Sequence, residues 1–395
     1  MNERALSPQR VASVDTYRGF VMFLIMAEVL HFSKISAAIP DSAFWSFLSF
    51  HQSHVPWVGC SLHDLIQPSF SFLVGVALPY SLASQIAKKA NNSTLWIKTL
   101  RRSLILVLLG IFLRSMHRDQ TYFTFEDTLS QIGLGYPILF ALAFSSERLQ
   151  WTAFIALLAG YWLLFATFPL PGTDFNWTET GSSADWEHNL KGFAAHWNKN
   201  TNAAWAFDRW FLNLFPRSEP FKFNGGGYST LSFIPTLATM ILGLIAGNWL
   251  KTINSSSLIL KKLYVTAAIL LSLAVLLGLT GLNPIVKRIW TPSWTLFSGA
   301  WCFLLLGLFY YMVDLKNLKD WFKIFIVIGS NSILAYVMVD FLPNFIHHSF
   351  EIHLGNGYDL LFGTPYRTLL SGFIIIFFEY LLLRSLYNRK VFIRI

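Results

Sequence analysis

The chain has 395 residues, of which 54% are hydrophobic and only 13% charged, with a formal net charge of +9. A soluble protein of this length needs far more charge to cover its surface, so the composition excludes an ordinary soluble enzyme. The positive charge does not indicate a nucleic-acid partner, because no basic stripe with interleaved aromatic residues occurs. The two cysteines, Cys60 and Cys302, lie far apart and exclude a disulfide framework.

Repeated apolar runs of about 18 or more residues predict an all-α, polytopic membrane helix bundle embedded in lipid. We predict ten membrane spans, at residues 18–38, 60–83, 100–116, 127–146, 150–170, 229–250, 261–281, 292–313, 321–344 and 366–387. A long polar insertion, residues 171–228, separates the first five spans (18–170) from the last five (229–387). We expect residues 1–395 to form a single membrane domain.

The distribution of basic residues predicts the orientation of the spans. With a cytoplasmic N-terminus, the inside segments hold 19 of the 30 Lys and Arg residues, and five of the other 11 lie in the insertion. The rule has little force in long loops, so the comparison is 19 against 6. It predicts that both termini are cytoplasmic and that residues 51–63 and the insertion lie on the outer side.

Several ionisable residues fall at the ends of predicted spans or inside them. Asp15 and Arg18 are spaced i, i+3 and could pair to anchor the first span. Glu28 lies about 15 Å deeper along that helix, and His31 follows one turn later. Carboxylates within a membrane are costly and usually mark function, so we expect Glu28 to face the bundle interior.

The segment HVPWVGCSLHDL (54–65) brings His54 to a turn before Pro56 and Asp64 to the first turn of the next helix. Asp64 could orient an imidazole or hold a substrate hydroxyl or amine. Alternatively, the histidines and Trp57 could anchor an interfacial loop at the lipid headgroups. The spacing of His51, His54, His63 and Asp64 matches no standard zinc pattern, and we predict no metal site.

Six motifs occur in the order found in one enzyme family, and the resemblance covers nearly the whole chain, from about residue 10 to 395. They are SVDTYRG (13–19), HVPWVGCSLHDLIQPSFSFLVG (54–75), LSQIGLGY (129–136), NGGGYSTLSFIPTLATMILGLIAG (224–247), NPIVKRIWTPSW (283–294) and GSNSILAYV (329–337). Together they resemble the heparan-alpha-glucosaminide N-acetyltransferase family, in its bacterial type. The resemblance implies an integral enzyme of a bacterial inner membrane. That enzyme would move acetyl from cytosolic acetyl-CoA to a terminal glucosamine amine of a glycan outside.

The resemblance also assigns residues to roles. His54 matches the family's catalytic histidine, and Asp64 matches its aspartate. For acetyl-CoA, which needs cations near the cytoplasm, we expect Asp15, Arg18, Arg101 and Arg102. For the acceptor we expect Trp57, Glu28, Gln131, Asn224, Lys287 and Asn331. His51 and His63 have no counterpart in the motif and are expected to matter less.

Several alternatives stay open at this point. His54 could act as a general base in direct transfer, which we favour, or carry the acetyl group itself. The oxyanion donor could be Asn331, the Trp57 indole or a backbone N–H. Competing functions are an O-acetyltransferase of a surface polysaccharide and a proton-coupled transporter using Glu28, His31 and Asp64, although no internal repeat supports a transporter. Homodimerisation is also left open.

The insertion contains five tryptophans, which are expected to cover the acceptor or to anchor the insertion at the membrane interface. They are Trp177, Trp186, Trp197, Trp205 and Trp210.

Overall fold

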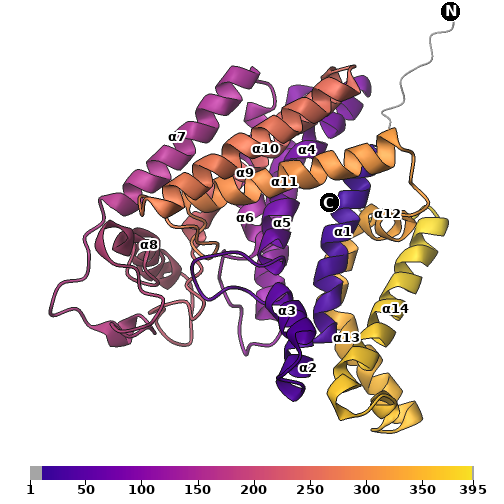
Figure 1. Cartoon of the computed structure of the whole chain (residues 1–395). Coiled ribbons are helices and arrows are strands. Elements are labelled where there is room, and N and C mark those ends of the chain that lie inside the picture. Colours follow the sequence, from indigo (N-terminus) through magenta and orange to yellow (C-terminus); the bar gives the residue numbers. More distant parts are fainter. Residues whose placement is uncertain (1–10, 394–395) are drawn as a thin grey trace, which may run out of the picture.

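A computed structural model describes residues 11–393 as an all-helical bundle (Figure 1). The long helices are α1 (Ala12–Met26), α4 (Ile66–Ala87), α5 (Asn92–Ser115), α6 (Thr128–Leu142), α7 (Glu147–Ala166), α9 (Phe233–Thr252), α10 (Ser256–Leu279), α11 (Pro292–Phe309), α13 (Ser332–Leu354) and α14 (Arg367–Asn388). The shorter ones are α2 (Phe32–Ala38), α3 (Ala43–Gln52), α8 (Ala203–Phe211) and α12 (Lys323–Ser330). Within the described range the extended backbone pairs only as an isolated bridge between Val58 and Val286.

The described helices confirm an integral membrane protein of the polytopic, all-α class. Six of them are long and apolar enough to cross a membrane, and the number rises to eight if two bent pairs each count as one span. Each of the ten predicted spans overlaps a helix. However, α6 is short, and α5 carries Lys98, Arg101, Arg102 and Arg114, so neither passes the same test. The count of ten spans therefore stays a prediction.

Two of the predicted spans are broken helices. After α1 the chain tightens into a 3-10 turn (Ala27–Leu30), and His31 has a left-handed φ of 47° before α2 begins. A non-glycine residue in this conformation cannot continue an α-helix, so 18–38 is not one straight span. Similarly, α12 and α13 meet at Asn331 with a bend of 85°. The Asn331 amide group donates to Val391 O and its oxygen accepts from Ile393 N, which ties this bend to the chain after α14.

Close packing of α4 against α9 forms the centre of the bundle. The two helices run in the same direction, with Gly243 against Phe72 and Gly247 against Val76. A Cβ atom on Gly243 would lie only 1.9 Å from the Phe72 carbonyl oxygen. Small residues let helix backbones approach in a membrane, where burial of apolar surface does not drive association. The other helices and the loops at both ends of the bundle are arranged around this closely packed pair.

The loops sort into two sets at opposite ends of the bundle. Figure 1 shows α2, α3 and the insertion with α8 at the lower end, while α4 and α14 finish at the upper end. The insertion forms α8 and short 3-10 turns and buries Trp197 and Trp205. The end of α3 and the insertion thus lie at the same end of the bundle, as predicted (Figure 1). Which end faces the cytoplasm stays a prediction. Arg4, Arg10 and Arg394, which contribute to the charge count, lie outside the described residues.

The α4–α9 contact predicts unequal effects of two glycine substitutions. Gly243→Ala should destabilise the protein by about 1–3 kcal/mol, because the added methyl group overlaps rigid backbone. Gly160→Ala in α7 is the matched control, since nothing lies within 4 Å of its added Cβ, and it should not lower stability. Thermal unfolding in detergent measures both. Equal melting temperatures for the two variants would contradict this packing.

Candidate active site

Hydrogen bonds join three loops: residues 53–62, the segment between α10 and α11, and the end of the insertion. Gly59 has a φ of +124°, which glycine tolerates best, and its N–H donates to Ile285 O at 3.1 Å. The adjacent Val58–Val286 bridge continues this pairing. Arg288 then donates to Val55 O at 3.3 Å and to Gly226 O at 3.0 Å. These bonds hold the residues after Ser53, those after Gly281 and the end of the insertion in one arrangement.

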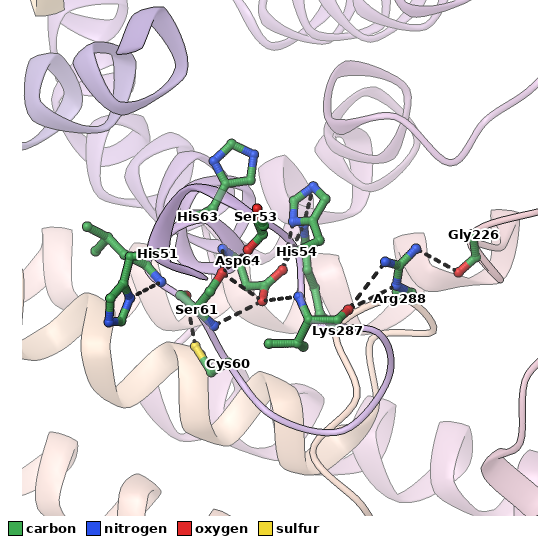
Figure 2. Close-up of polar contacts among 12 residues, drawn as sticks. His51, Ser53, His54, Cys60, Ser61, His63, Asp64, Gly226, Lys287 and Arg288 are labelled. Atoms are coloured by element: carbon green, nitrogen blue, oxygen red, sulfur yellow. Dashed lines mark hydrogen bonds and ion pairs between the residues drawn. The ribbon is translucent and has the colours of Figure 1, made fainter. Parts of the chain in front are cut away.

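Asp64 is fully buried at the centre of this arrangement. Its Oδ2 accepts hydrogen bonds from Val55 N at 3.3 Å, Ser61 N at 3.0 Å and Ser61 Oγ at 3.1 Å. Its Oδ1 lies 2.8 Å from His54 Nδ1. An ionised carboxylate only accepts, so Nδ1 carries the hydrogen in this bond and Nε2 is the basic nitrogen. Figure 2 shows these side chains converging.

Lys287 completes the cluster and sets its electrostatics. Its Nζ lies 3.5 Å from Asp64 Oδ1 and 3.0 and 3.3 Å from the two ring nitrogens of His54. Burial lowers the pKa of Lys287 to about 8, although Asp64 opposes that shift. Burial also lowers the pKa of His54, with the Asp64 hydrogen bond opposing and the Lys287 charge adding to the decrease. These effects favour the neutral form of His54.

A cavity of about 750 Å³ opens beside this cluster. His54, Lys287, Glu28 and Asn224 line it, as do the polar residues His63, Gln67, Arg114, His117, Arg118, Tyr122, Glu126, Asp127, Thr128, Tyr228, Tyr336 and Asp340. Gln131 stands behind the wall, within 3.3 Å of Gln67. The volume of the cavity suits a small polar ligand. Within residues 11–393, no group of three or more His, Cys, Asp or Glu side chains could hold a metal ion.

Several cavity residues were not singled out from the sequence for this site. Arg114, His117 and Arg118 follow Gly110 at the end of α5, and Glu126 and Asp127 precede α6. Their positions at adjoining helix ends were visible in the sequence, but only the packing of α5 against α6 shows that they share one cavity. Burial raises the pKa of Glu126.

The histidines near Glu28 differ from expectation. Glu28 lies 3.3 Å from His63 Nε2 rather than against His31, because the turn after α1 leaves His31 exposed. The His63 ring lies 4.5 Å from the His54 ring, and His63 lines the cavity. His51 lies outside the cavity wall, where its Nδ1 accepts from Leu62 N at 3.2 Å. Of the two histidines expected to matter less, His63 is thus inside the site.

Two residues predicted to act on the substrate lie elsewhere. Trp57 is only 1% exposed and its indole N–H donates to Trp197 O, so it packs under the insertion rather than forming a wall of the cavity. Asn331, at the bend before α13, binds the chain near Val391 and does not line this cavity. Both proposed side-chain oxyanion donors are therefore already engaged. None of the five insertion tryptophans lines the cavity; Phe223, Asn224, Gly225 and Tyr228 from the end of the insertion region do.

A second cavity, of about 290 Å³, adjoins the first deeper in the bundle. Its basic residues are Arg18, which lies 3.4 Å from Asp15 Oδ1, and Arg102, which donates to Tyr136 OH at 3.1 Å. Arg101 is exposed and outside it. Thr128 and Tyr336 line both cavities. These two residues therefore form a wall that the two cavities share.

Comparison with known proteins finds distant relatives of this chain. No family model matches the chain. The chain is 24% identical over 386 residues to the heparan-alpha-glucosaminide N-acetyltransferase of Homo sapiens, across 87% of this chain and 55% of that protein. It is 23% identical over 393 residues to the Mus musculus protein of the same name, across 88% and 56%.

The chain is a distant relative of heparan-alpha-glucosaminide N-acetyltransferases. It spans about half the length of the curated relatives it matches. The matched region includes most of the bundle, because it covers nearly nine-tenths of this chain. The relationship predicted from the six motifs is thus confirmed at the level of distant homology with these N-acetyltransferases.

The cluster predicts how Lys287 affects its neighbour. Lys287→Met retains the length of the side chain but removes a positive charge that lowers the pKa of His54. The pKa of His54 should therefore rise. Diethylpyrocarbonate acylates neutral imidazole, so the midpoint of His54 acylation against pH, followed by peptide mass spectrometry, should move to higher pH. Lys199→Met, which lies on the Trp186 ring outside the cavity, is the control and should leave the midpoint unchanged. A midpoint that stays or falls in Lys287→Met would contradict the electrostatic role.

Proposed function

We propose that this protein is a membrane acetyltransferase that moves acetyl from acetyl-CoA to the amine of an amino sugar, such as a terminal glucosamine of a glycan. The observation that carries the proposal is the His54–Asp64 pair on the wall of a cavity that shares Thr128 and Tyr336 with a second cavity containing Arg18 and Arg102. The names of the distant relatives supply the reaction class. Neither a helix bundle nor a cavity alone would indicate it.

The smaller cavity is the proposed entrance for acetyl-CoA. Arg18 and Arg102 supply cations for the phosphates of CoA, and guanidinium groups bind phosphate in bidentate geometry. Apolar side chains, including Phe70, Leu73 and Leu106, line the same cavity and suit the less polar arm that carries the thioester. On the charge count this end faces the cytoplasm, where acetyl-CoA is made. The thioester would then reach His54 past Thr128 and Tyr336.

The larger cavity is the proposed acceptor site, and His54 is the proposed general base. A neutral amine attacks the thioester carbonyl, and Nε2 takes a proton from the nitrogen as the C–N bond forms. The C–S bond then breaks, and the CoA thiolate leaves as a thiol after receiving the proton from the imidazolium. Asp64 stabilises the imidazolium, as a buried carboxylate does for other catalytic histidines.

Lys287 has two proposed contributions to this step. Its ammonium disfavours a resting imidazolium, so His54 is available as a base near neutral pH. Its Nζ is also within 3.3 Å of Nε2, close to the atoms where the oxyanion develops. Since the Trp57 and Asn331 side chains are engaged elsewhere, Lys287 replaces them as the side-chain donor in the proposal.

Transfer from labelled acetyl-CoA to glucosamine by the purified protein tests the function. N-acetylglucosamine offers hydroxyl groups without a free amine, so it distinguishes N- from O-acetylation. We expect transfer to glucosamine and a 10²–10⁴-fold lower rate for His54→Ala, because the general base is lost. Labelled CoA binding should be retained. His51→Ala, outside the cavity, should keep the wild-type rate. Labelling of N-acetylglucosamine alone would support the O-acetyltransferase alternative, and full activity of His54→Ala would refute the assigned base.

The donor site makes a separate prediction about three arginines. Arg18→Ala and Arg102→Ala should each weaken acetyl-CoA binding about tenfold or more, because each removes a charge-assisted contact to phosphate. Arg101→Ala is the control, since Arg101 is exposed and lies outside the cavity. Equilibrium binding of acetyl-CoA to protein in detergent measures all three. Equal losses for Arg101→Ala and Arg102→Ala would move the donor site away from this cavity.

A further inference from the structure

A third cavity, of about 290 Å³, has no part in the proposed reaction. It opens between α7, α9 and α10, and its walls combine aromatic rings, aliphatic side chains and two ammonium groups. Trp151 comes from α7 and Trp249 from α9, while Leu258, Lys261, Lys262 and Val265 come from α10.

The cavity lies at an end of the bundle, where a membrane protein meets water. Trp249 is in the last turn of α9, and Trp151 and Lys261 are close to the starts of α7 and α10. The Asn248 and Gln150 side chains, 3.4 Å apart, join the end of α9 to the start of α7. Lys251 Nζ donates to Pro79 O, which places this end beside the last turns of α4. Tryptophan and lysine concentrate at this depth of a membrane protein.

The chemistry of the walls is that of a receptor for an anion with an apolar tail. Lys262 Nζ lies 4.8 Å from the centroid of the Trp249 ring, a cation–π contact that holds the ammonium at the cavity. No carboxylate lines the cavity, and Lys261 and Lys262 have no ion pair within residues 11–393. Glu147 is nearby, with its Oε1 3.4 Å from Trp151 Nε1. This single carboxylate is outnumbered by the two ammonium groups of Lys261 and Lys262. The local charge is positive.

The aliphatic part of the wall faces outward. Leu258, in the first turn of α10, is 44% exposed, and Val265 (48%) and Ile269 (55%) continue the exposed apolar face from the cavity toward the middle of the helix. An anion held by the two lysines would therefore have an apolar surface directly beside it. Inorganic phosphate would use the lysines alone, whereas a phospholipid would use both parts of the wall.

We propose that this cavity binds an anionic phospholipid, with its phosphate between Lys261 and Lys262 and its acyl chains along Val265 and Ile269. Basic pockets between membrane helices bind anionic headgroups on the cytoplasmic side, which is the side that the charge count assigns to this end of the bundle. The bound lipid joins α7, α9 and α10 at their ends. This site is independent of the acetyltransferase proposal.

Native mass spectrometry of the detergent-purified full chain, titrated with phosphatidylglycerol, tests the proposal. Lys261→Gln/Lys262→Gln should bind the lipid about 30-fold more weakly, which corresponds to the usual contribution of two lysines near an anionic lipid surface. Lys261→Arg/Lys262→Arg keeps both charges and should retain binding, which separates loss of charge from loss of fold. Phosphatidylcholine should bind more weakly than phosphatidylglycerol to the wild-type protein.

The matched control is Lys88→Gln/Lys89→Gln, which removes the same charge from exposed residues at the end of α4. It should retain wild-type affinity. Equal affinities of the wild-type protein and the Lys261→Gln/Lys262→Gln variant would overturn the proposal, as would equal losses in the two glutamine variants. Effective competition by millimolar inorganic phosphate would show a simple anion site and would overturn the lipid assignment as well.

Discussion

The rest of the site depends on the burial of the Asp64 carboxylate. A buried charge is stable only when hydrogen-bond donors replace the water it has lost. Removing a partner leaves the charge uncompensated and destabilises the fold by several kcal/mol. The backbone N–H groups of Val55 and Ser61, the Ser61 hydroxyl and the His54 ring all serve this carboxylate. The loop between α3 and α4 must therefore fold around Asp64. Because His54 is one of the donors, the same requirement fixes its tautomer.

Lys287 links this loop to a distant part of the sequence. It is nearly as buried as Asp64, and a buried ammonium needs a nearby anion. The adjoining Arg288 binds Val55 O and Gly226 O, so the segment before α11 also positions the end of the insertion. An electrostatic cluster and three loops are thus a single unit. A change in any of the loops would reach His54 through hydrogen bonds rather than through direct contact.

The bundle gives the two cavities different electrostatic characters. The smaller one has two arginines among mostly apolar residues, whereas the larger one has carboxylates, histidines, two arginines and a buried lysine. Their common residues, Thr128 and Tyr336, lie where α6 begins and one turn after the sharp bend between α12 and α13. A broken helix is tolerated inside a membrane protein where it borders a cavity or is buried in protein. Here the break lies beside the junction of the two cavities.

The sequence by itself determined the membrane class, because low charge and long apolar runs can be stable only in lipid. It also suggested the Asp15–Arg18 pair and the His54–Asp64 pair, whose members are close in sequence, and the structure contains both. Contacts between remote segments could not be predicted in this way. The sequence suggested that Lys287 belongs to the site, but only the pairing of Gly59 with Ile285 places it against His54.

Tertiary structure alone decided which aromatic and ionisable groups face a cavity. Trp57 had the signature of a pocket wall, yet packing against Trp197 buries it beneath the insertion. In a continuous helix His31 would lie one turn after Glu28, but His31 is left-handed and ends the helix, and Glu28 lies against His63 instead. Helical spacing gives the neighbours of a residue only while the helix continues. Where backbone geometry breaks that spacing, the partner of a charged group is set by which helices pack together, and this depends on the whole bundle.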